Sequence, residues 1–494
     1  MRHSWLLWFL PLAALSCAAP TKYDLVSPAD TIRYVIGAAP AEWSAPAFDD
    51  SAWTILRGAI AAPADGARTI FARRKFDLGP RAGDYRVVSL KVKTRGAYKA
   101  YLNGVAWYAG RGSANPVSLI VAPGLLHETG NVLGLEVSAP SGATTIEVQP
   151  TLDGAAQRPQ TAQVVKGPYL IGARPDGITI EWETDRAVQS NAIINNVVID
   201  GGAAIHHQAI VHNLIASKSY SYCLETAGRR SEASSFTTAA NPGERLRFVV
   251  YGDNRTDGDA HRRVVEAIER EQPDFLINTG DLVDASKEDE WQSFFNLEYG
   301  LLRNTPLYPA YGNHETHADA SSFRRYFPIG NPNLFSGTVY GFDYGDVHVA
   351  VLNSNAALEA QAKWLDDDLS SAERRGAKHE FVVMHWGPYS SGTQVRHGNN
   401  EDARAYIAPI AKAHRADAIF AGHDHFYERG QSDALAYFVT GGGGAPLIPA
   451  GRIRETIRSV SCNHYLVVDV AGAIAKVSAK DLAGNVFDSV ALTR

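Results

Sequence analysis

The sequence predicts a multidomain protein in which two N-terminal all-β sandwich domains precede a layered α/β domain. A chain of 494 residues is longer than one hydrophobic core usually serves, so two or three domains are expected. Up to residue 242, short alternating runs of apolar and polar residues are separated by Gly, Pro, Asn and Asp, which is typical of β-sandwiches. From residue 244 onward, strand-like runs alternate with helix-like segments, which indicates α and β layers.

The net charge gives no sign of a nucleic-acid partner. The formal charge is -6 and the isoelectric point is about 6.2, whereas proteins that bind nucleic acids usually have a positively charged surface that contacts the phosphate backbone. We therefore expect no nucleic-acid surface, and a small anionic substrate would need local attraction.

Residues 1–20 have the pattern of a secretory signal. Two basic residues precede an apolar run from Trp5 to Leu15, which is too short to span a bilayer and is followed by small residues. The run ends at Cys17 in a stretch that resembles a bacterial lipobox, although Ala14 stands where Leu is more typical. Lipidation of Cys17 and ordinary cleavage after Ala18 both remain open. We expect export to the periplasm, the outer membrane as a lipoprotein, or the medium, with membrane contact only through a lipid on Cys17.

Residues 21–155 read as an all-β domain without a helix-period segment. Alternating runs such as 85–93 and 146–149 lie between turn residues. The stretch resembles the galactose-binding-like jelly roll appended to many glycosidases, through the phrases 48–53, 71–76, 101–104 and 131–137.

Three aromatic residues of this domain have two interpretations. Trp53, Trp107 and Tyr108 are able to stack on a sugar, or they belong to the core of the domain. The resemblance implies an accessory or spacer domain with a glycan as its partner if the aromatic faces are free.

Residues 159–242 read as a second, smaller β-sandwich. The runs 177–184, 220–223 and 235–238 are spaced as strands of such a domain. They resemble the fibronectin type III-like domain that precedes the catalytic domain in purple acid phosphatases.

Residues 244–494 read as the α/β domain. A helix is expected over Ala260–Arg270, with Asp259 as its N-cap, and another over Leu358–Leu369. Apolar β-branched runs predict buried strands at 347–352, 380–384, 418–420, 437–440 and 465–470.

Polar residues follow the ends of five predicted strands in this domain. Runs at 246–250, 275–278 and 307–310 each lead into a Gly and then a metal-capable side chain. Two further runs lead into histidines. Strand ends of an open α/β sheet share one edge, where ligands bind. The six candidate ligands are Asp253, Asp281, Asn313, His385, His423 and His425.

The order of these blocks, GD, GD, GNHE, a lone His and GHDH, resembles the signature of the calcineurin-like metallophosphoesterases. The resemblance implies an αββα sandwich and two divalent or trivalent ions, such as Fe, Zn or Mn. It places Asp281 as the bridge between the ions, Asp253 and His425 on the first ion, and Asn313, His385 and His423 on the second. Hard oxygen ligands and imidazoles suit such ions.

The same resemblance assigns residues to the substrate. His314 would protonate the leaving group or steady the phosphate. His397, in the 388–398 loop, corresponds approximately to a second substrate-facing His of purple acid phosphatases. Arg255 has a planar fork of donors that suits phosphate oxygens, with a structural ion pair as the alternative.

The sequence departs from the family pattern at two ligand positions. Many relatives have His where this chain has Arg255, and purple acid phosphatases have Tyr where it has Asp284. The first ion thus lacks one of the protein ligands that the family pattern provides. Asp284, His261 or a water molecule would supply the missing ligand.

The missing Tyr predicts the colour of the protein. The resemblance implies that this Tyr produces the iron charge-transfer band of purple acid phosphatases, so we expect the native protein to lack such a band. A visible absorption spectrum of the purified protein tests this, and strong absorption in the green would contradict it.

The sequence thus predicts an exported metallophosphoesterase that hydrolyses phosphate monoesters by attack of a hydroxide held at a dinuclear site. Its partner would be a small phosphate ester. A phosphodiesterase or nucleotide hydrolase using the same site is the alternative within this class. From another class, a carbohydrate-binding surface protein with an inactive phosphoesterase scaffold also remains open.

Overall fold

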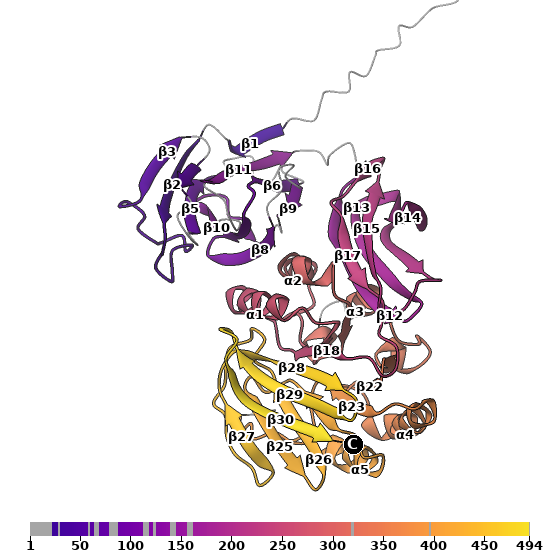
Figure 1. Cartoon of the computed structure of the whole chain (residues 1–494). Helices are drawn as coiled ribbons and strands as arrows, with labels where there is room; N and C mark the ends of the chain where they lie inside the picture. Colours follow the sequence, from indigo (N-terminus) through magenta and orange to yellow (C-terminus); the bar gives the residue numbers. More distant parts are fainter. Residues whose placement is uncertain are drawn as a thin grey trace, which may run out of the picture.

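The structure, a computed structural model, confirms the predicted order of two all-β regions followed by an α/β region (Figure 1). It describes residues 22–27, 30–57, 60–63, 69–78, 87–111, 118–121, 125–138, 145–155, 162–317, 321–394 and 397–493. The predicted signal segment and Cys17 lie outside these residues. None of the helices described is long and apolar enough to cross a membrane.

The first region contains two antiparallel sheets. One has the order β1-β11-β6-β9, with β4 also paired to β11, and the other has the order β3-β2-β5-β10-β7-β8. Apolar residues of both sheets, such as Leu90, Leu135 and Leu152, share one buried cluster. The strands are β1 (Lys22–Val26), β2 (Thr31–Ile36), β3 (Thr54–Arg57), β4 (Ile60–Pro63), β5 (Thr69–Phe76), β6 (Val87–Lys93), β7 (Ala97–Leu102), β8 (Val105–Arg111), β9 (Ser118–Ile120), β10 (Asn131–Ser138) and β11 (Thr145–Ala155).

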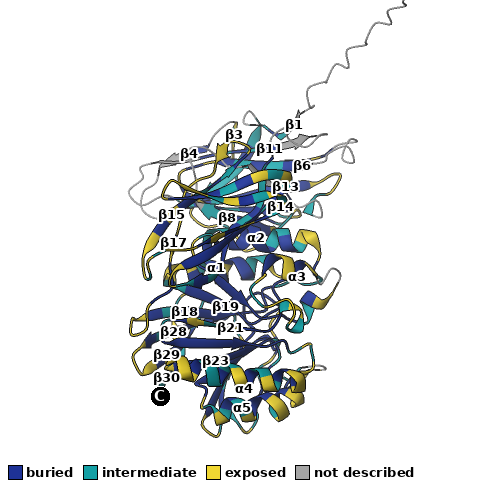
Figure 2. Ribbon diagram, turned by 90° about the vertical axis from the view of Figure 1, so that its right-hand side faces the viewer, coloured by how far each residue is buried: buried dark blue, intermediate teal, exposed yellow. Residues whose placement is uncertain are grey.

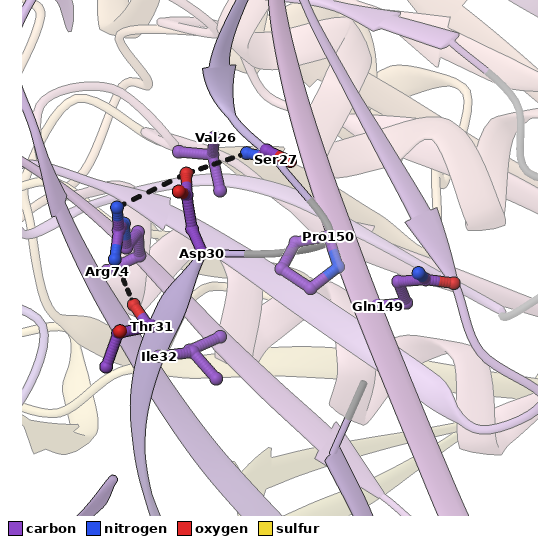
Figure 3. Close-up of a pocket in the computed structure, with 8 residues that line it drawn as sticks. All are labelled: Val26, Ser27, Asp30, Thr31, Ile32, Arg74, Gln149 and Pro150. Atoms are coloured by element: carbon purple, nitrogen blue, oxygen red, sulfur yellow. Dashed lines mark hydrogen bonds and ion pairs between the residues drawn. The ribbon is translucent and has the colours of Figure 1, made fainter. Parts of the chain in front are cut away.

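An ion pair links two neighbouring strands of the second of these sheets. The guanidinium of Arg74 on β5 lies 3.2 Å from the Asp30 carboxylate, and it also donates to the Thr31 carbonyl (Figure 3). Asp30 in turn accepts a hydrogen bond from the Ser27 backbone at 2.9 Å. The link holds the start of β2 against β5.

The aromatic residues considered for sugar stacking pack inside this region. Trp107 and Tyr108 are buried in its core. Trp53 stacks on Trp43, with 6.2 Å between ring centroids. Trp107 and Tyr108 are therefore core residues, as one of the two interpretations predicts. A glycan partner for this region remains a prediction.

The second region is a six-stranded antiparallel assembly around one long strand, β13. Strand β13 pairs with β12, β14 and β15 along its length. Cys223 on β15 and Cys462 are both free thiols. The strands are β12 (Val164–Arg174), β13 (Gly177–Ile194), β14 (Val197–Val211), β15 (Ser219–Thr226), β16 (Arg229–Arg230) and β17 (Ser234–Thr237).

The third region has two sheets stacked face to face between helices, which confirms the predicted layers. One sheet has the order β20-β19-β18-β28-β29-β30 and the other β21-β22-β23-β24-β26-β25-β27. Figure 2 shows buried sheets between helices with exposed outer faces. The strands are β18 (Leu246–Tyr251), β19 (Phe275–Asn278), β20 (Leu307–Pro309), β21 (Tyr340–Tyr344), β22 (Val347–Val351), β23 (His379–Met384), β24 (Ala418–Ala421), β25 (Tyr427–Ser432), β26 (Leu435–Thr440), β27 (Thr456–Val460), β28 (His464–Ala471), β29 (Ile474–Asp481) and β30 (Val486–Thr493).

Alternate residues of the central strands face different layers. Phe248 of β18 contacts Phe381 of β23 across the two sheets, with 5.6 Å between ring centroids. Its neighbour Val249 belongs instead to the cluster that includes Val264 of α1. Because both faces of such strands are buried, their sequences are continuously apolar.

The two helices predicted from the sequence lie close to their expected ranges, with two differences. The N-cap of α1 (Gly258–Glu271) is Asp257, whose carboxylate accepts from the Asp259 and Ala260 backbones, and the prediction of Asp259 is wrong. Helix α4 (Leu358–Arg375) continues beyond Leu369 to a C-cap at Gly376. The other helices are α2 (Glu288–Leu302), α3 (Ser321–Tyr326) and α5 (Ala408–Ala413).

A buried histidine links helix α4 to the second sheet. Both ring nitrogens of His348 on β22 face carboxylates, Nδ1 at 2.7 Å from Asp343 and Nε2 at 2.9 Å from Asp368. Arg375 also approaches Nδ1 at 3.4 Å. Burial alone would lower the pKa of His348, but the two carboxylates raise it to about 9.

This raised pKa predicts a pH-dependent contribution to stability. The folded pKa exceeds the unfolded value near 6.5, so the contribution is complete below pH 6.5 and is lost as the pH rises through 9. We expect His348→Gln to cost about 2 kcal/mol of unfolding free energy at pH 6, and less at pH 9.5. Urea denaturation at both pH values measures this, with the exposed His212→Gln as control. An equal cost at both pH values would contradict the assignment.

The second and third regions share one apolar core. Residues from β12 to β17 and from both sheets of the third region belong to a single buried cluster. The Tyr308 hydroxyl donates to the Ala173 carbonyl at 3.1 Å, and the Tyr169 hydroxyl donates to the Tyr326 carbonyl at 2.9 Å. Strand β8 of the first region contacts α1 and α2.

Candidate metal centre

The six predicted ligands meet at one edge of the two stacked sheets. They lie on the segments that follow β18, β19, β20, β23 and β24. Strands β18, β19 and β20 run parallel to one another in one sheet, as do β23 and β24 in the other, so their carboxyl ends share an edge. Asp253, Asp281 and His385 are buried, and each offers an atom within 4.8 Å of the other two.

Four donor atoms surround one point, and we call their residues the converging set (Asp281, Asn313, His385 and His423). Asn313 Oδ1 lies 3.0 Å from both His385 Nε2 and His423 Nδ1. His385 Nε2 lies 3.2 Å from His423 Nδ1 and 3.3 Å from Asp281 Oδ1. Two ligands each about 2.1 Å from an ion lie roughly 3.0–3.4 Å apart at octahedral or tetrahedral angles. The converging set therefore fits one metal ion.

Neighbouring groups fix the orientation of the two imidazoles in the converging set. His385 Nδ1 lies 2.9 Å from the Thr279 carbonyl, which only accepts, so Nδ1 holds a proton and Nε2 is the nitrogen that faces the other donor atoms. The Trp386 ring stacks on His423 with 4.8 Å between centroids, and its Nε1 donates to the Gly398 carbonyl at 2.7 Å.

The other candidate ligands form a second group beside the converging set, which we call the flanking set (Asp253, Asp281 Oδ2 and His425). His425 Nε2 lies 3.5 Å from Asp253 Oδ1, and His425 Nδ1 donates to the Pro446 carbonyl at 2.8 Å. Arg255 enters this group: its Nε lies 3.2 Å from Asp281 Oδ2 and its Nη2 lies 3.4 Å from His425 Nε2.

Three of the candidate ligands adopt a left-handed backbone. Asp253, Asp281 and His423 have φ values of 57°, 56° and 70°. This conformation is costly for residues other than Gly and tends to occur at functional sites. A Cβ on the adjacent Gly280 would lie 2.7 Å from His385 Nδ1, so only glycine leaves room for that imidazole.

The electrostatics of the site favour a bound cation. Burial opposes the ionisation of Asp281, but His385 and His314 lower its pKa. Burial would lower the pKa of His385, yet Asp281 and Asp253 raise it to about 9. The buried carboxylates thus attract positive charge to the position that the converging set surrounds.

Two residues considered as extra ligands are bound elsewhere. His261 on α1 lies with its Nε2 at 2.8 Å from Glu298 and its ring stacked on Phe294. Asp284 accepts from Arg255 Nη1 at 2.9 Å. Neither side chain joins the converging set.

The three predicted substrate residues border the site and are partly exposed. His314 Nδ1 donates to the Asp284 carbonyl, and its Nε2 lies 3.8 Å from Asp281 Oδ2. His397 bonds through Nδ1 to Asp424, and its ring centroid lies 5.0 Å from that of His423. Arg255 makes the ion pair that the sequence left as an alternative to phosphate binding.

Two buried carboxylates that the sequence reasoning missed support the loops of the site. Glu315 accepts backbone hydrogen bonds from Asp281, Leu282, Val283 and Gly312 at 2.8–3.3 Å. Asp424 accepts from the Ser390 hydroxyl and from the Gly398 backbone, the latter at 3.0 Å. The sequence contained one signal for these roles: Glu315 is part of the GNHE block and Asp424 is part of the GHDH block.

Comparisons with known proteins agree with this geometry. Residues 246–427 match the family model described as calcineurin-like phosphoesterase. Purple acid phosphatase 21 of Arabidopsis thaliana is 30% identical over 239 residues, which cover 46% of this chain and 53% of the relative. Probable purple acid phosphatase 20 of the same plant is 24% identical over 293 residues, 53% of this chain and 67% of the relative. The chain thus spans between about half and two thirds of the length of these relatives.

Solved structures share the fold. Purple acid phosphatase PPD1 from yellow lupin (Lupinus luteus) seeds superposes with a TM-score of 0.60 at 16% identity, covering 88% of this chain and 96% of the lupin chain. A structure of PhoD superposes with a TM-score of 0.51 at 12% identity, covering 68% and 88% of the two chains.

Proposed function

We propose that this protein, whose residues 246–427 form a calcineurin-like phosphoesterase domain with purple acid phosphatase relatives, is an exported metal-dependent phosphatase acting on phosphate monoesters. The observation that carries the proposal is the converging set, in which donor atoms from four loops lie 3.0–3.3 Å from one another. A small phosphate ester is the proposed substrate.

The converging set holds the metal in this proposal. A bound ion would supply Lewis acidity toward a phosphoryl oxygen and an activated water as nucleophile. Asp281 would contribute negative charge to hold the ion, and His385, whose Nδ1 is bonded to the Thr279 carbonyl, would bind it through Nε2.

The partly exposed residues act on the ester itself. His314 is held through Nδ1 by the Asp284 carbonyl, so Nε2 is the atom that donates a proton to the leaving oxygen. His397, oriented by Asp424, faces the same side of the site. With Arg255 these side chains provide donors for a doubly charged phosphoryl group, which supports a monoester.

The role of His314 predicts a dependence on the leaving group. We expect His314→Ala to lower kcat about 10²-fold or more for an alkyl phosphate, because the alkoxide needs a proton. The loss is expected to be much smaller for p-nitrophenyl phosphate, whose phenolate leaves unprotonated. Equal losses for both esters, measured by phosphate release, would contradict proton donation by His314.

Substrate class is tested by comparing p-nitrophenyl phosphate with bis(p-nitrophenyl) phosphate. The purified chain is assayed with each of Mn²⁺, Zn²⁺ and Fe²⁺ after removal of bound metal. A higher kcat/KM for the monoester supports the proposal, and a higher value for the diester replaces it with a phosphodiesterase. No hydrolysis with any metal would favour an inactive scaffold in a carbohydrate-binding protein.

Export is proposed from the pattern of residues 1–20. Mass spectrometry of the mature protein from its native cell distinguishes an N-terminus after Ala18 from a lipidated Cys17. A mature chain that retains Met1 would contradict export.

A further inference from the structure

Unlike the converging set, the flanking set contains a positively charged side chain, the guanidinium of Arg255. The Arg255 guanidinium contacts two of the three groups that the sequence predicts for the first ion. Nε lies 3.2 Å from Asp281 Oδ2, and Nη2 lies 3.4 Å from His425 Nε2. The third group, Asp253, is 3.5 Å from His425.

Neighbouring residues hold the guanidinium in this position. Asp284, which the sequence suggests as a replacement ligand, accepts from Nη1 at 2.9 Å, and Thr256 lies 3.3 Å from the same atom. The His425 ring donates from Nδ1 to the Pro446 carbonyl, which turns Nε2 toward Arg255 Nη2 and Asp253 Oδ1. The Arg255 side chain is only 15% exposed. A guanidinium stays protonated at any physiological pH, so its charge is permanent.

The position of Arg255 competes directly with an ion. An ion bound by Asp281 Oδ2 and His425 Nε2 would lie about 2 Å from each atom. Both atoms already face guanidinium nitrogens at 3.2 and 3.4 Å, so such an ion would be in contact with a second cation. Asp284, which the sequence suggests as a replacement ligand, is itself paired with Arg255.

We propose that Arg255 takes the place of the first metal ion, so that the chain binds a single ion in the converging set and uses the guanidinium as its second positive charge. Asp281 then bridges an ion and a guanidinium, with Oδ1 toward His385 and Oδ2 toward Arg255. A phosphoryl group would be held between one metal ion and one arginine. The inference rests on the proposed function only in taking the converging set to bind metal.

Metal stoichiometry tests the inference. The full chain is loaded with Mn²⁺, separated from free metal by gel filtration, and analysed for manganese per chain by mass spectrometry. We expect one ion in the natural protein and two in Arg255→His, where an imidazole replaces the guanidinium. The exposed Arg263→His on α1 is the matched control and should keep one ion.

Electron paramagnetic resonance gives a second measurement on the same samples. The natural protein should give the spectrum of an isolated Mn²⁺ ion, and Arg255→His that of a spin-coupled pair. Two coupled ions in the natural protein would overturn the inference while leaving the proposed function intact, and one ion in both proteins would also overturn it. No bound ion in any variant would instead refute the proposed function.

Discussion

The Asp281→Asn protein is expected to bind metal at least about 10²-fold more weakly and to lose about 10³-fold or more in kcat/KM. Asp281 Oδ1 faces His385 and accepts from the His314 backbone, while Oδ2 accepts from Arg255. The Asn side chain has only one oxygen. Its NH₂ group would therefore face either the converging set or the Arg255 guanidinium. Removal of the buried charge weakens both contacts.

Isothermal titration with Mn²⁺ and steady-state kinetics with p-nitrophenyl phosphate measure these two losses. Asp367→Asn on α4 is the control, because this exposed carboxylate pairs with Lys363 on the same helix. Circular dichroism establishes that both variants are folded. Full activity of a folded Asp281→Asn protein would remove the basis of the proposed function.

Glu315→Gln is expected to destabilise the fold by about 3 kcal/mol and to weaken metal binding roughly 10- to 100-fold. Each oxygen of Glu315 accepts two backbone hydrogen bonds, Oε1 from Leu282 and Val283, and Oε2 from Asp281 and Gly312. In Gln one of these oxygens becomes an NH₂ group, which would face two buried N–H donors. The loops that carry Asp281 and Asn313 then lose their common support.

Urea denaturation and metal titration test this prediction. Glu401→Gln changes a carboxylate that is 75% exposed and serves as the control. If Glu315→Gln matched the natural protein in both unfolding free energy and metal affinity, the backbone contacts of Glu315 would have no role in supporting the site.

Periodicity and strand-end residues were sufficient to predict the layers and the meeting of the six candidate ligands. The strands that precede the candidate ligands, such as β19, β23 and β24, are buried along their length, so their sequences are mainly apolar runs. The order of five such runs then predicts a shared edge. The roles of the individual ligands remain predictions.

Other features depend on tertiary contacts that local patterns do not reveal. Helix α2 escaped prediction. It packs against α1, β8 and β12, and its buried residues include the polar Asn296 and Glu298 beside apolar ones such as Trp291, which obscures an apolar stripe in the sequence. The partners of His261 and Arg255 are 37 and 26 residues away in sequence. Residue spacing alone could not show that His261 pairs with Glu298, or that Arg255 pairs with Asp281.

The apolar core shared by the second and third regions indicates that the phosphoesterase domain does not fold separately from the second region. Tyr169 and Tyr308, on opposite sides of the apparent boundary near residue 244, are both buried and donate hydrogen bonds across it. A fragment that begins at that boundary would expose the apolar face beneath β12 and leave these hydroxyl bonds unmade. The strands of the second region, β12 to β17, therefore belong to the same folding unit as the phosphoesterase domain, and exchanging them between relatives would require the buried face to be exchanged as well.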